Sequence, residues 1–316
     1  MVDLNNVNDD QKQAIIATEG PVLIIAGPGT GKTFTLVKRI SYLISEIGVN
    51  PREIMVVTFT EKAAKELLTR ISNDFIENGI NININEMYIG TFHSVCLRLL
   101  KENAPNHDGN GRDRMLDAFE QTYLVCKNLE NFNRLHGFAE QFPNRMGDWN
   151  QALEICRYVN QLREELVDID AMLNDADEDM RLLAKLVCRY NELLDHEGAI
   201  DFSAIQTDTF RMLEENEEIL KRLRDTISYI MVDEYQDTNY VQEQIVLKLM
   251  GDKKNVCVVG DDDQGMYRFR GATIRNILEF PTHFAEGECK IVHLNNNYRS
   301  EPGIIDFYNK WMERKV

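Results

Sequence analysis

The run AGPGTGKT at residues 26–33 constrains the fold of this chain more than any other feature. An apolar segment, Val22–Ala26, precedes it, and apolar residues at helical spacing follow it. The glycines Gly27, Gly29 and Gly31 allow the backbone to curl, so that successive N–H groups and a helix N-terminus point at one anion. A strand, a glycine loop and a helix in this order predict a phosphate-binding loop in an α/β domain.

The side chains of this loop have the chemistry that a nucleoside triphosphate with Mg²⁺ requires. Lys32 is expected to reach the β- and γ-phosphates, and the Thr33 hydroxyl is expected to bind Mg²⁺. Pro28 and Thr30 complete the loop. Ala26 stands where the strict pattern has glycine, so the alternative for this run alone is a plain tight turn before a helix.

A second run, VDEYQDTN at 232–239, puts two adjacent carboxylates at the end of the apolar segment Ile227–Val232. That segment predicts a buried strand, and ligands of open α/β sheets bind outside the carboxyl ends of their strands. We expect Asp233 to hold Mg²⁺, directly or through water, and Glu234 to accept the proton of an attacking water. Such a pair alone is a common strand end, but beside a glycine loop it predicts hydrolysis of a nucleoside triphosphate.

Composition limits the class of protein. A chain of 316 residues that is 43% hydrophobic predicts a soluble globular protein with two or three domains. Because the N-terminus lacks signal-peptide features and no apolar run approaches membrane-spanning length, we expect a cytoplasmic protein without a membrane partner. The net charge of −17 argues against a general electrostatic hold on nucleic acid but leaves a local basic groove open. Six cysteines without CxxC spacing predict reduced, mostly buried thiols.

Apolar runs that predict strands occur early and late in the chain, at 54–59, 87–91, 229–233, 256–260 and 291–294. Between about 105 and 200 no such run occurs, and the pattern predicts helices instead, such as 149–166 and 180–194. The glycine loop and the carboxylate pair lie on either side of this helical stretch. We therefore predict an α/β core with a parallel sheet that a helical subdomain interrupts.

Further motifs follow along the chain: TFTEKAAKELLTR at 58–70, GTFHS at 90–94, IDF at 200–202, VVGDDDQGMYRFRGA at 258–272 and LNNNYRS at 294–300. Leu4, Asn5, Gln11 and Ala14 precede them all. Together with the two runs described above, these motifs resemble those of the UvrD/Rep-like DNA helicases of superfamily 1, in the same order and over nearly the whole chain.

This resemblance implies a fold and a division into domains. The fold is a RecA-like P-loop NTPase core with a parallel sheet, interrupted by an all-helical subdomain. The implied division has three parts. A first RecA-like lobe comprises residues 1–104 and 200–294, a helical subdomain is inserted between them at 105–199, and residues 295–316 begin a second lobe. Because the family's later motifs are absent, we expect a fragment without the rest of the second RecA-like lobe. Such a fragment is expected to hydrolyse ATP weakly and not to unwind duplex alone.

The resemblance also implies roles around ATP and Mg²⁺. Gln11 would recognise adenine, Tyr298 would stack on it, and Arg299 would approach the γ-phosphate. Gln264 would sense the γ-phosphate. The residues expected to carry catalysis are therefore Lys32, Glu234, Gln264 and Arg299.

Other residues are implied to face single-stranded nucleic acid: Phe59, Thr60, Thr91, His93, Tyr267, Phe269 and Arg270. The two aromatic residues of the later motif would stack on bases, which contributes roughly 1–3 kcal/mol per base and tolerates any sequence. Phe269 stands where the family often has tryptophan, and phenylalanine still stacks. A core position remains the alternative for Phe59, orientation of a helix for His93, and a buried aromatic pair for Tyr267 with Phe269.

The implied activity is ATP hydrolysis coupled to 3′–5′ movement on single-stranded DNA and to duplex unwinding, in DNA repair or replication. Its partners would be single-stranded and forked DNA. Two alternatives stay open: the motor portion of a helicase-nuclease, and a non-catalytic nucleic-acid-binding scaffold. RNA as the substrate is also open, because base stacking does not read the sugar.

Overall fold

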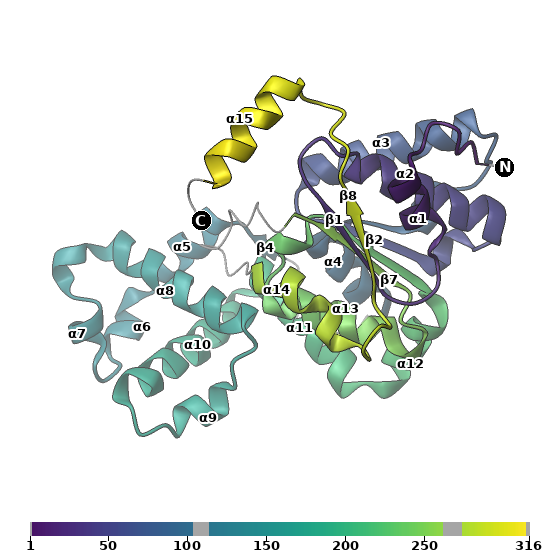
Figure 1. The fold of residues 1–316 in the computed structure, drawn as a ribbon. Helices are drawn as coiled ribbons and strands as arrows, with labels where there is room; N and C mark the ends of the chain where they lie inside the picture. The colour runs from purple at the N-terminus through teal and green to yellow at the C-terminus, as the bar shows by residue number, and fades with distance from the viewer. Residues whose placement is uncertain (1, 104–113, 262–273, 314–316) are drawn as a thin grey trace.

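A computed structural model describes residues 2–103, 114–261 and 274–313 of the chain. Its centre is a six-stranded sheet in the order β3-β2-β6-β7-β1-β8, in which all neighbouring strands run parallel (Figure 1). The strands are β1 (Val22–Ala26), β2 (Ile54–Thr58), β3 (Tyr88–Thr91), β6 (Tyr229–Val232), β7 (Val256–Gly260) and β8 (Lys290–Leu294). All the strand-like runs of the sequence are confirmed, with ends that differ by at most two residues.

Helices cover both faces of this sheet because its strands alternate their side chains between two hydrophobic clusters. On β2, Ile54 and Val56 face one cluster, whereas Met55 and Val57 face the other. The first cluster lies under α1 (Asp9–Ile16), α2 (Lys32–Tyr42) and α3 (Glu61–Glu77). The second lies under α4 (Phe92–Asn103), α11 (Phe202–Glu215), α12 (Glu217–Thr226), α13 (Tyr240–Met250) and α14 (Ile274–Glu279).

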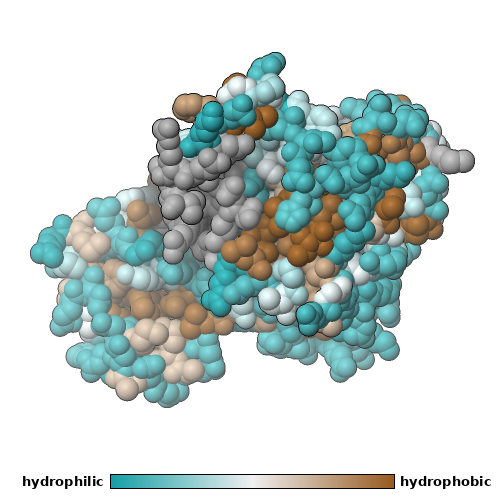
Figure 2. All heavy atoms as spheres, in the orientation of Figure 1, coloured by the Kyte–Doolittle hydropathy of each residue, from teal (hydrophilic) through white to brown (hydrophobic). Residues whose placement is uncertain are grey.

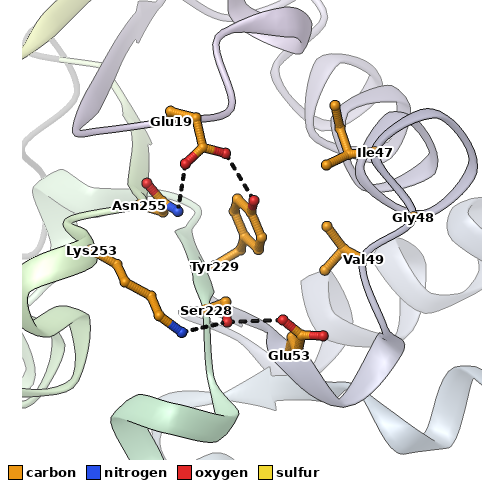
Figure 3. A pocket seen from close by; sticks show the side chains of 9 residues that line it. All are labelled: Glu19, Ile47, Gly48, Val49, Glu53, Ser228, Tyr229, Lys253 and Asn255. Atoms are coloured by element: carbon orange, nitrogen blue, oxygen red, sulfur yellow. Dashed lines mark hydrogen bonds between the residues drawn. The ribbon is translucent and has the colours of Figure 1, made fainter.

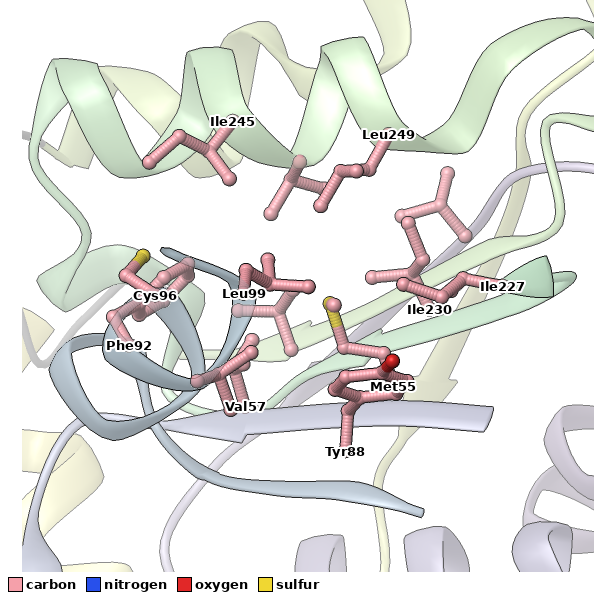
Figure 4. Close-up of a cluster of buried hydrophobic side chains, with 14 of the residues drawn as sticks. Met55, Val57, Tyr88, Phe92, Cys96, Leu99, Ile227, Ile230, Ile245 and Leu249 are labelled. Atoms are coloured by element: carbon pink, nitrogen blue, oxygen red, sulfur yellow. The ribbon is translucent and has the colours of Figure 1, made fainter. Parts of the chain in front are cut away.

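Figure 4 shows the second cluster in section, with Ile245 and Leu249 of α13 above Met55 and Val57 of β2. Leu99 of α4 fills the space between them and is fully buried. Burying aliphatic side chains of this size contributes roughly 1.5–3 kcal/mol each. This packing fixes the carboxyl ends of the strands, from which the candidate site is built.

A helical body with its own core lies to one side of the sheet (Figure 1). Its helices are α5 (Ala118–Lys127), α6 (Leu129–Asn133), α7 (Phe138–Gln141), α8 (Asp148–Glu164), α9 (Ile169–Leu173) and α10 (Glu178–Glu197). Two of them correspond to the helices that the sequence predicted at 149–166 and 180–194. The absence of strands between about 105 and 200 is a wrong prediction, because β4 (Arg114–Leu116) pairs in parallel with β5 (Ala199–Asp201). At three residues, β4 is too short for an alternating pattern to reveal it.

A buried ion pair connects this helical body to the core. The Asp201 carboxylate, 2% exposed, lies 3.0 Å from Arg163 Nη1 of α8. It also accepts hydrogen bonds from the Tyr190 hydroxyl, Gln121 Nε2 and the Ala204 N–H at the start of α11. Burial alone would raise the pKa of Asp201, but Arg163, the Tyr190 hydroxyl and the Ala204 N–H hold it below its ordinary value.

The remaining elements are short, apart from the final helix. A π-helical turn continues α2 over Leu43–Ile47, and 3-10 turns occupy Pro51–Glu53, Ile84–Glu86, Asn144–Met146, Tyr235–Asp237, Gly251–Lys253 and Phe280–His283. The final helix, α15 (Pro302–Glu313), projects away from the sheet (Figure 1). Hydrophilic side chains cover most of the face seen in Figure 2, in keeping with the net charge of −17.

Candidate nucleotide and nucleic-acid site

The glycine loop turns at the carboxyl end of β1 and leads into α2, as the sequence predicts. Gly31 adopts a φ of 91°, and a side chain there would place its Cβ 2.7 Å from Gln11 Nε2. Gly29 adopts a φ of 79°, and a Cβ there would lie 2.7 Å from that of Arg299. Both positions need glycine for the backbone conformation and for space.

The two predicted carboxylates lie beside this loop and differ in environment. Asp233 is 7% exposed, and its carboxylate accepts a hydrogen bond from the Glu234 N–H at 3.1 Å. Burial and the nearby Glu234 carboxylate raise the pKa of Asp233 to about 7, although Lys32 opposes them. Glu234 adopts a left-handed conformation with a φ of 53°, and its Oε2 lies 3.2 Å from Lys32 Nζ. The site is therefore short of positive charge around Asp233.

This shortage suits a divalent cation. Mg²⁺ takes oxygen ligands and is commonly bound through one or two carboxylates, substrate phosphates and waters. The buried Asp233 carboxylate and the Thr33 hydroxyl line one pocket, so they provide a donor set of this kind. Asp233 and Thr33 are thus the residues that would hold the ion.

The pocket itself has a volume of about 380 Å³. It brings together residues that the sequence predicted from three separate motifs: Pro28, Gly29, Gly31, Lys32, Thr33, Asp233, Glu234, Tyr298 and Arg299. Four further lining residues were not predicted: Phe34, Ala63, Glu66 and Arg70. Phe34 follows the loop directly, and Ala63 belongs to the apolar set of α3. Glu66 and Arg70 come from the exposed side of α3, where helical periodicity alone indicates only a solvent face.

Gln11 lies beneath the loop, where it is 2% exposed. Its Nε2 donates to the Thr30 carbonyl at 3.1 Å, and its Oε1 accepts from the Asn8 N–H at 3.2 Å as part of a capping box. Its side chain therefore ties the start of α1 to the glycine loop. Recognition of adenine by Gln11 stays a prediction.

The segment after β8 folds back over the same loop. The Tyr298 N–H donates to the Gly29 carbonyl at 2.8 Å, and Asn297 Nδ2 donates to the Pro28 carbonyl at 2.7 Å. The Tyr298 ring remains 63% exposed, and its hydroxyl accepts from Asn8 Nδ2 at 2.6 Å. Tyr298 and Arg299 thus lie over the pocket, and their contacts with a nucleotide stay predictions.

Gln236 is a site residue that the sequence reasoning missed. It is 2% exposed, and its Nε2 donates to Glu234 Oε2 at 2.8 Å. Its Oε1 accepts from the Asp261 N–H at 3.0 Å, directly after β7. A Cβ at Gly260 would lie 2.5 Å from this oxygen, so glycine makes room for the contact. Its place two residues after Glu234 in VDEYQDTN was the only available signal.

Four of the residues predicted to contact nucleic acid lie at the carboxyl ends of β2 and β3: Phe59, Thr60, Thr91 and His93. Phe59 follows β2 and is half-buried, and the Thr60 hydroxyl accepts from the Ala63 N–H at 3.1 Å to cap α3. The Thr91 hydroxyl donates to Glu61 Oε1 at 3.2 Å. The later predicted residues Gln264, Tyr267, Phe269 and Arg270 lie outside the described residues.

His93 lies in the first turn of α4, half-buried. Burial lowers the pKa of His93 to about 4, with Glu61 opposing, so its imidazole is neutral at ordinary pH. Its ring meets that of Phe202 edge to face, with centroids 5.1 Å apart. Phe202 is 43% exposed and was not predicted as a site residue, although the motif IDF contains it.

A second cavity, of about 450 Å³, lies at the opposite edge of the sheet and has a different character. It is lined by Glu53, Ser228 and Asn255, which stand directly before β2, β6 and β7, and by Glu19, which lies in the turn before β1 (Figure 3). Their polar groups bond to one another and to their neighbours: Tyr229 to Glu19 at 2.9 Å, Lys253 to Ser228 at 2.9 Å and Ser228 to Glu53 at 2.9 Å. Because these groups satisfy each other, we assign no ligand to this cavity.

Two further observations concern membranes and thiols. Of the helices that the structure describes, none combines the length and apolar character that a bilayer crossing requires. All six cysteines are free thiols, three of them buried and three half-buried.

Comparisons with known proteins agree with this geometry. Residues 7–285 match the model of the UvrD/REP helicase N-terminal domain. The chain is 34% identical over 308 residues to proteins named ATP-dependent DNA helicase PcrA from Staphylococcus aureus and from Staphylococcus epidermidis. These alignments cover 97% of this chain and 40% of each relative, so the chain spans well under half of their length. The glycine loop, the carboxylate pair and the family match together assign this chain to the UvrD/REP helicase family, as its N-terminal domain.

Proposed function

We propose that this chain is the N-terminal part of an ATP-dependent DNA helicase. It would bind ATP with Mg²⁺ and couple hydrolysis to 3′–5′ movement along single-stranded DNA, in repair or replication. The observation that carries the proposal is the pocket in which Lys32, buried Asp233 and Glu234 meet beneath Tyr298 and Arg299. The names of the PcrA relatives support ATP and DNA as the ligands. Direction and biological role rest on the family resemblance alone.

The chain's own residues have separable tasks at the nucleotide. Lys32, paired with Glu234 at 3.2 Å, would exchange this carboxylate for the incoming phosphates and release Glu234. The freed Glu234 would take a proton from the attacking water, and the hydrogen bond from Gln236 would hold it in position. Mg²⁺, when bound, supplies positive charge that stabilises the developing charge on the phosphate oxygens. Arg299 and Gln264 would act at the γ-phosphate.

Contacts with the single strand are proposed along the carboxyl ends of β2 and β3. Phe59, Thr60, Thr91 and His93 would form one part of this track, with Phe202 added because its ring is exposed beside His93. Tyr267, Phe269 and Arg270 would complete it. Stacking on aromatic rings tolerates any base, which a protein that moves along DNA requires.

The test is steady-state ATP hydrolysis with and without single-stranded DNA, for the wild type, Lys32→Ala and Glu234→Gln. We expect turnover that DNA stimulates and that both substitutions abolish, while Glu234→Gln still binds ATP. Retained binding without any difference in hydrolysis between the wild type and Glu234→Gln would instead favour a non-catalytic scaffold.

A further inference from the structure

Gln206 of α11 lies between His93 of the proposed single-strand track and Asn239 of the segment that carries Glu234. It is 1% exposed. Its Nε2 lies 2.7 Å from His93 Nε2, and its Oε1 lies 3.4 Å from Asn239 Nδ2. His93 belongs to the predicted single-strand track, and Asn239 is the last residue of VDEYQDTN. One buried amide therefore contacts both motifs.

A backbone group determines which way this amide points. Asn239 caps α13, and its Oδ1 accepts from the Gln242 N–H at 3.1 Å. The other end of the Asn239 amide, Nδ2, must therefore face Gln206 as a donor. Gln206 must then turn its Oε1 to Asn239 and its Nε2 to His93.

The orientation of Gln206 sets the protonation of His93 in turn. Because Gln206 Nε2 can only donate, His93 Nε2 must be the acceptor, and the ring proton resides on Nδ1. Burial keeps the ring neutral, which agrees with this assignment. Among the residues that the structure describes, none forms a hydrogen bond with His93 Nδ1, so this N–H is free to donate to a ligand.

The second contact of Gln206, with Asn239, connects it to the segment that carries the predicted nucleotide-site residues Asp233 and Glu234. Asn239 ends the short segment that begins with Asp233 and Glu234. The preceding residue, Thr238, accepts from Asn276 Nδ2 through its carbonyl at 3.0 Å, which ties the segment to α14. A movement of His93 that displaces Gln206 would thus act on the C-terminal end of this segment, the end that α14 also holds.

We propose that Gln206 is a positioning residue that holds His93 in the Nδ1–H tautomer and links it to Asn239. The free Nδ1–H would donate to a phosphate oxygen of the single strand. Through Gln206, this contact would be transmitted to the segment that positions Glu234. The inference rests on the proposed function for its role in coupling, whereas the tautomer can be tested without any activity.

The first experiment measures the His93 tautomer by ¹⁵N–¹H NMR of histidine-labelled protein, with a His93→Gln variant for assignment. Asn239→Asp keeps an oxygen to cap α13 but presents a second oxygen to Gln206. The Gln206 amide must then turn over, and the ring proton must move to His93 Nε2. We expect this shift in Asn239→Asp, and Gln206→Leu, which removes the donor to His93 Nε2, should likewise release the ring from the Nδ1–H tautomer.

Two results of this experiment would overturn the inference. One is a folded Asn239→Asp protein with an unchanged tautomer, and the other is a folded Gln206→Leu protein whose His93 ring stays entirely in the Nδ1–H form. Gln206→Glu provides a second route if Asn239→Asp does not fold. Its carboxylate accepts at both ends, so the proton is expected on His93 Nε2, and an unchanged ring would contradict the inference.

The second experiment measures the ratio of ATP turnover with and without oligothymidylate. We expect Gln206→Leu to lower this ratio about tenfold, the range that coupling through buried networks gives. Gln151→Leu is the matched control, because Gln151 is also 1% exposed but lies in the helical body, where it donates to the Phe142 carbonyl. Stimulation that survives Gln206→Leu would overturn the coupling role alone, whereas a wild type that neither binds nor hydrolyses ATP would overturn the proposed function as well.

Discussion

Asp201 and Asp233 are both nearly fully buried, yet their surroundings oppose each other. The pKa of Asp201 is lowered by Arg163, the Tyr190 hydroxyl, the Ala204 N–H at a helix N-terminus and the Ser203 hydroxyl, which together outweigh burial. The Asp233 carboxylate accepts a hydrogen bond from one backbone N–H, but burial and the neighbouring Glu234 carboxylate raise its pKa to about 7. A compensated charge belongs to the architecture of the protein, whereas an uncompensated charge at the end of a central strand is suited to a ligand.

The largest effect is expected from removing the uncompensated charge. Asp233→Asn should lower ATP turnover roughly 10³-fold or more, because a metal ligand contributes several kcal/mol to the transition state. At pH 8 without Mg²⁺, its free energy of unfolding should equal or exceed that of the wild type, since a buried unpaired charge is gone. Denaturant titration and steady-state turnover measure the two quantities. A strongly destabilised variant would mean that Asp233 is structural, like Asp201.

The reverse result is expected for the compensated charge. Asp201→Asn leaves the Arg163 guanidinium, 9% exposed, without its anionic partner, and should cost about 3–5 kcal/mol of unfolding free energy. Replacing both partners, with Asp201→Leu and Arg163→Met, should recover part of this loss. Chemical denaturation checks both variants. Equal stability of Asp201→Asn and the wild type would remove the distinction between the two carboxylates.

The contribution of Asp233 to the pH dependence of stability can be isolated by comparing the free energies of unfolding of the wild type and Asp233→Asn. The pKa of Asp233 rises from 3.8 in a free side chain to about 7 in the folded protein, so the folded state holds the extra proton between these values. Relative to Asp233→Asn, the wild type should therefore lose stability, on the order of a few kcal/mol, as the pH rises from about 4 to about 7. Unfolding curves of both proteins across this range give the difference. Parallel curves would contradict the raised pKa.

The smallest effect is expected next to Asp201. Phe202→Ala should weaken single-stranded DNA binding by roughly 1–3 kcal/mol, the contribution of one stacked base. Because the ring is 43% exposed, its loss should change stability little, in contrast to the neighbouring aspartate. Fluorescence anisotropy with labelled DNA and thermal unfolding measure the two effects. Unchanged DNA affinity would exclude Phe202 from the track.

Much of the core could be predicted because its signals are local. Strands buried on both faces read as continuous apolar runs, so β2, β6 and β7 were evident from the sequence. The glycine loop was also evident, because Gly29 and Gly31 satisfy a backbone need that adjacent residues reveal. Periodicity likewise located α8 and α10, with ends that differed by a few residues.

Contacts between distant segments left no such signal. The strand β4 exists because β5 pairs with it across the helical body, and its three residues show no pattern alone. In the sequence, nothing distinguishes Gln206 from other polar residues of a helix. Its role becomes visible only because folding brings His93 of α4 and Asn239, which caps α13, against it. Phe34 and Arg70 line the pocket only because α2 and α3 pack side by side.

The sequence by itself determined the class of the fold, the phosphate loop and the carboxylate pair, since each depends on neighbouring residues. It did not show how differently the two aspartates are surrounded, because Ala-Ile-Asp and Met-Val-Asp are both a short apolar run that ends in a carboxylate. Tertiary structure decided between them by bringing α5, α8 and α10 to Asp201. Burial makes an unpaired charge costly. The partners that folding brings to a carboxylate therefore determine whether it stabilises the protein or is left able to bind a cation.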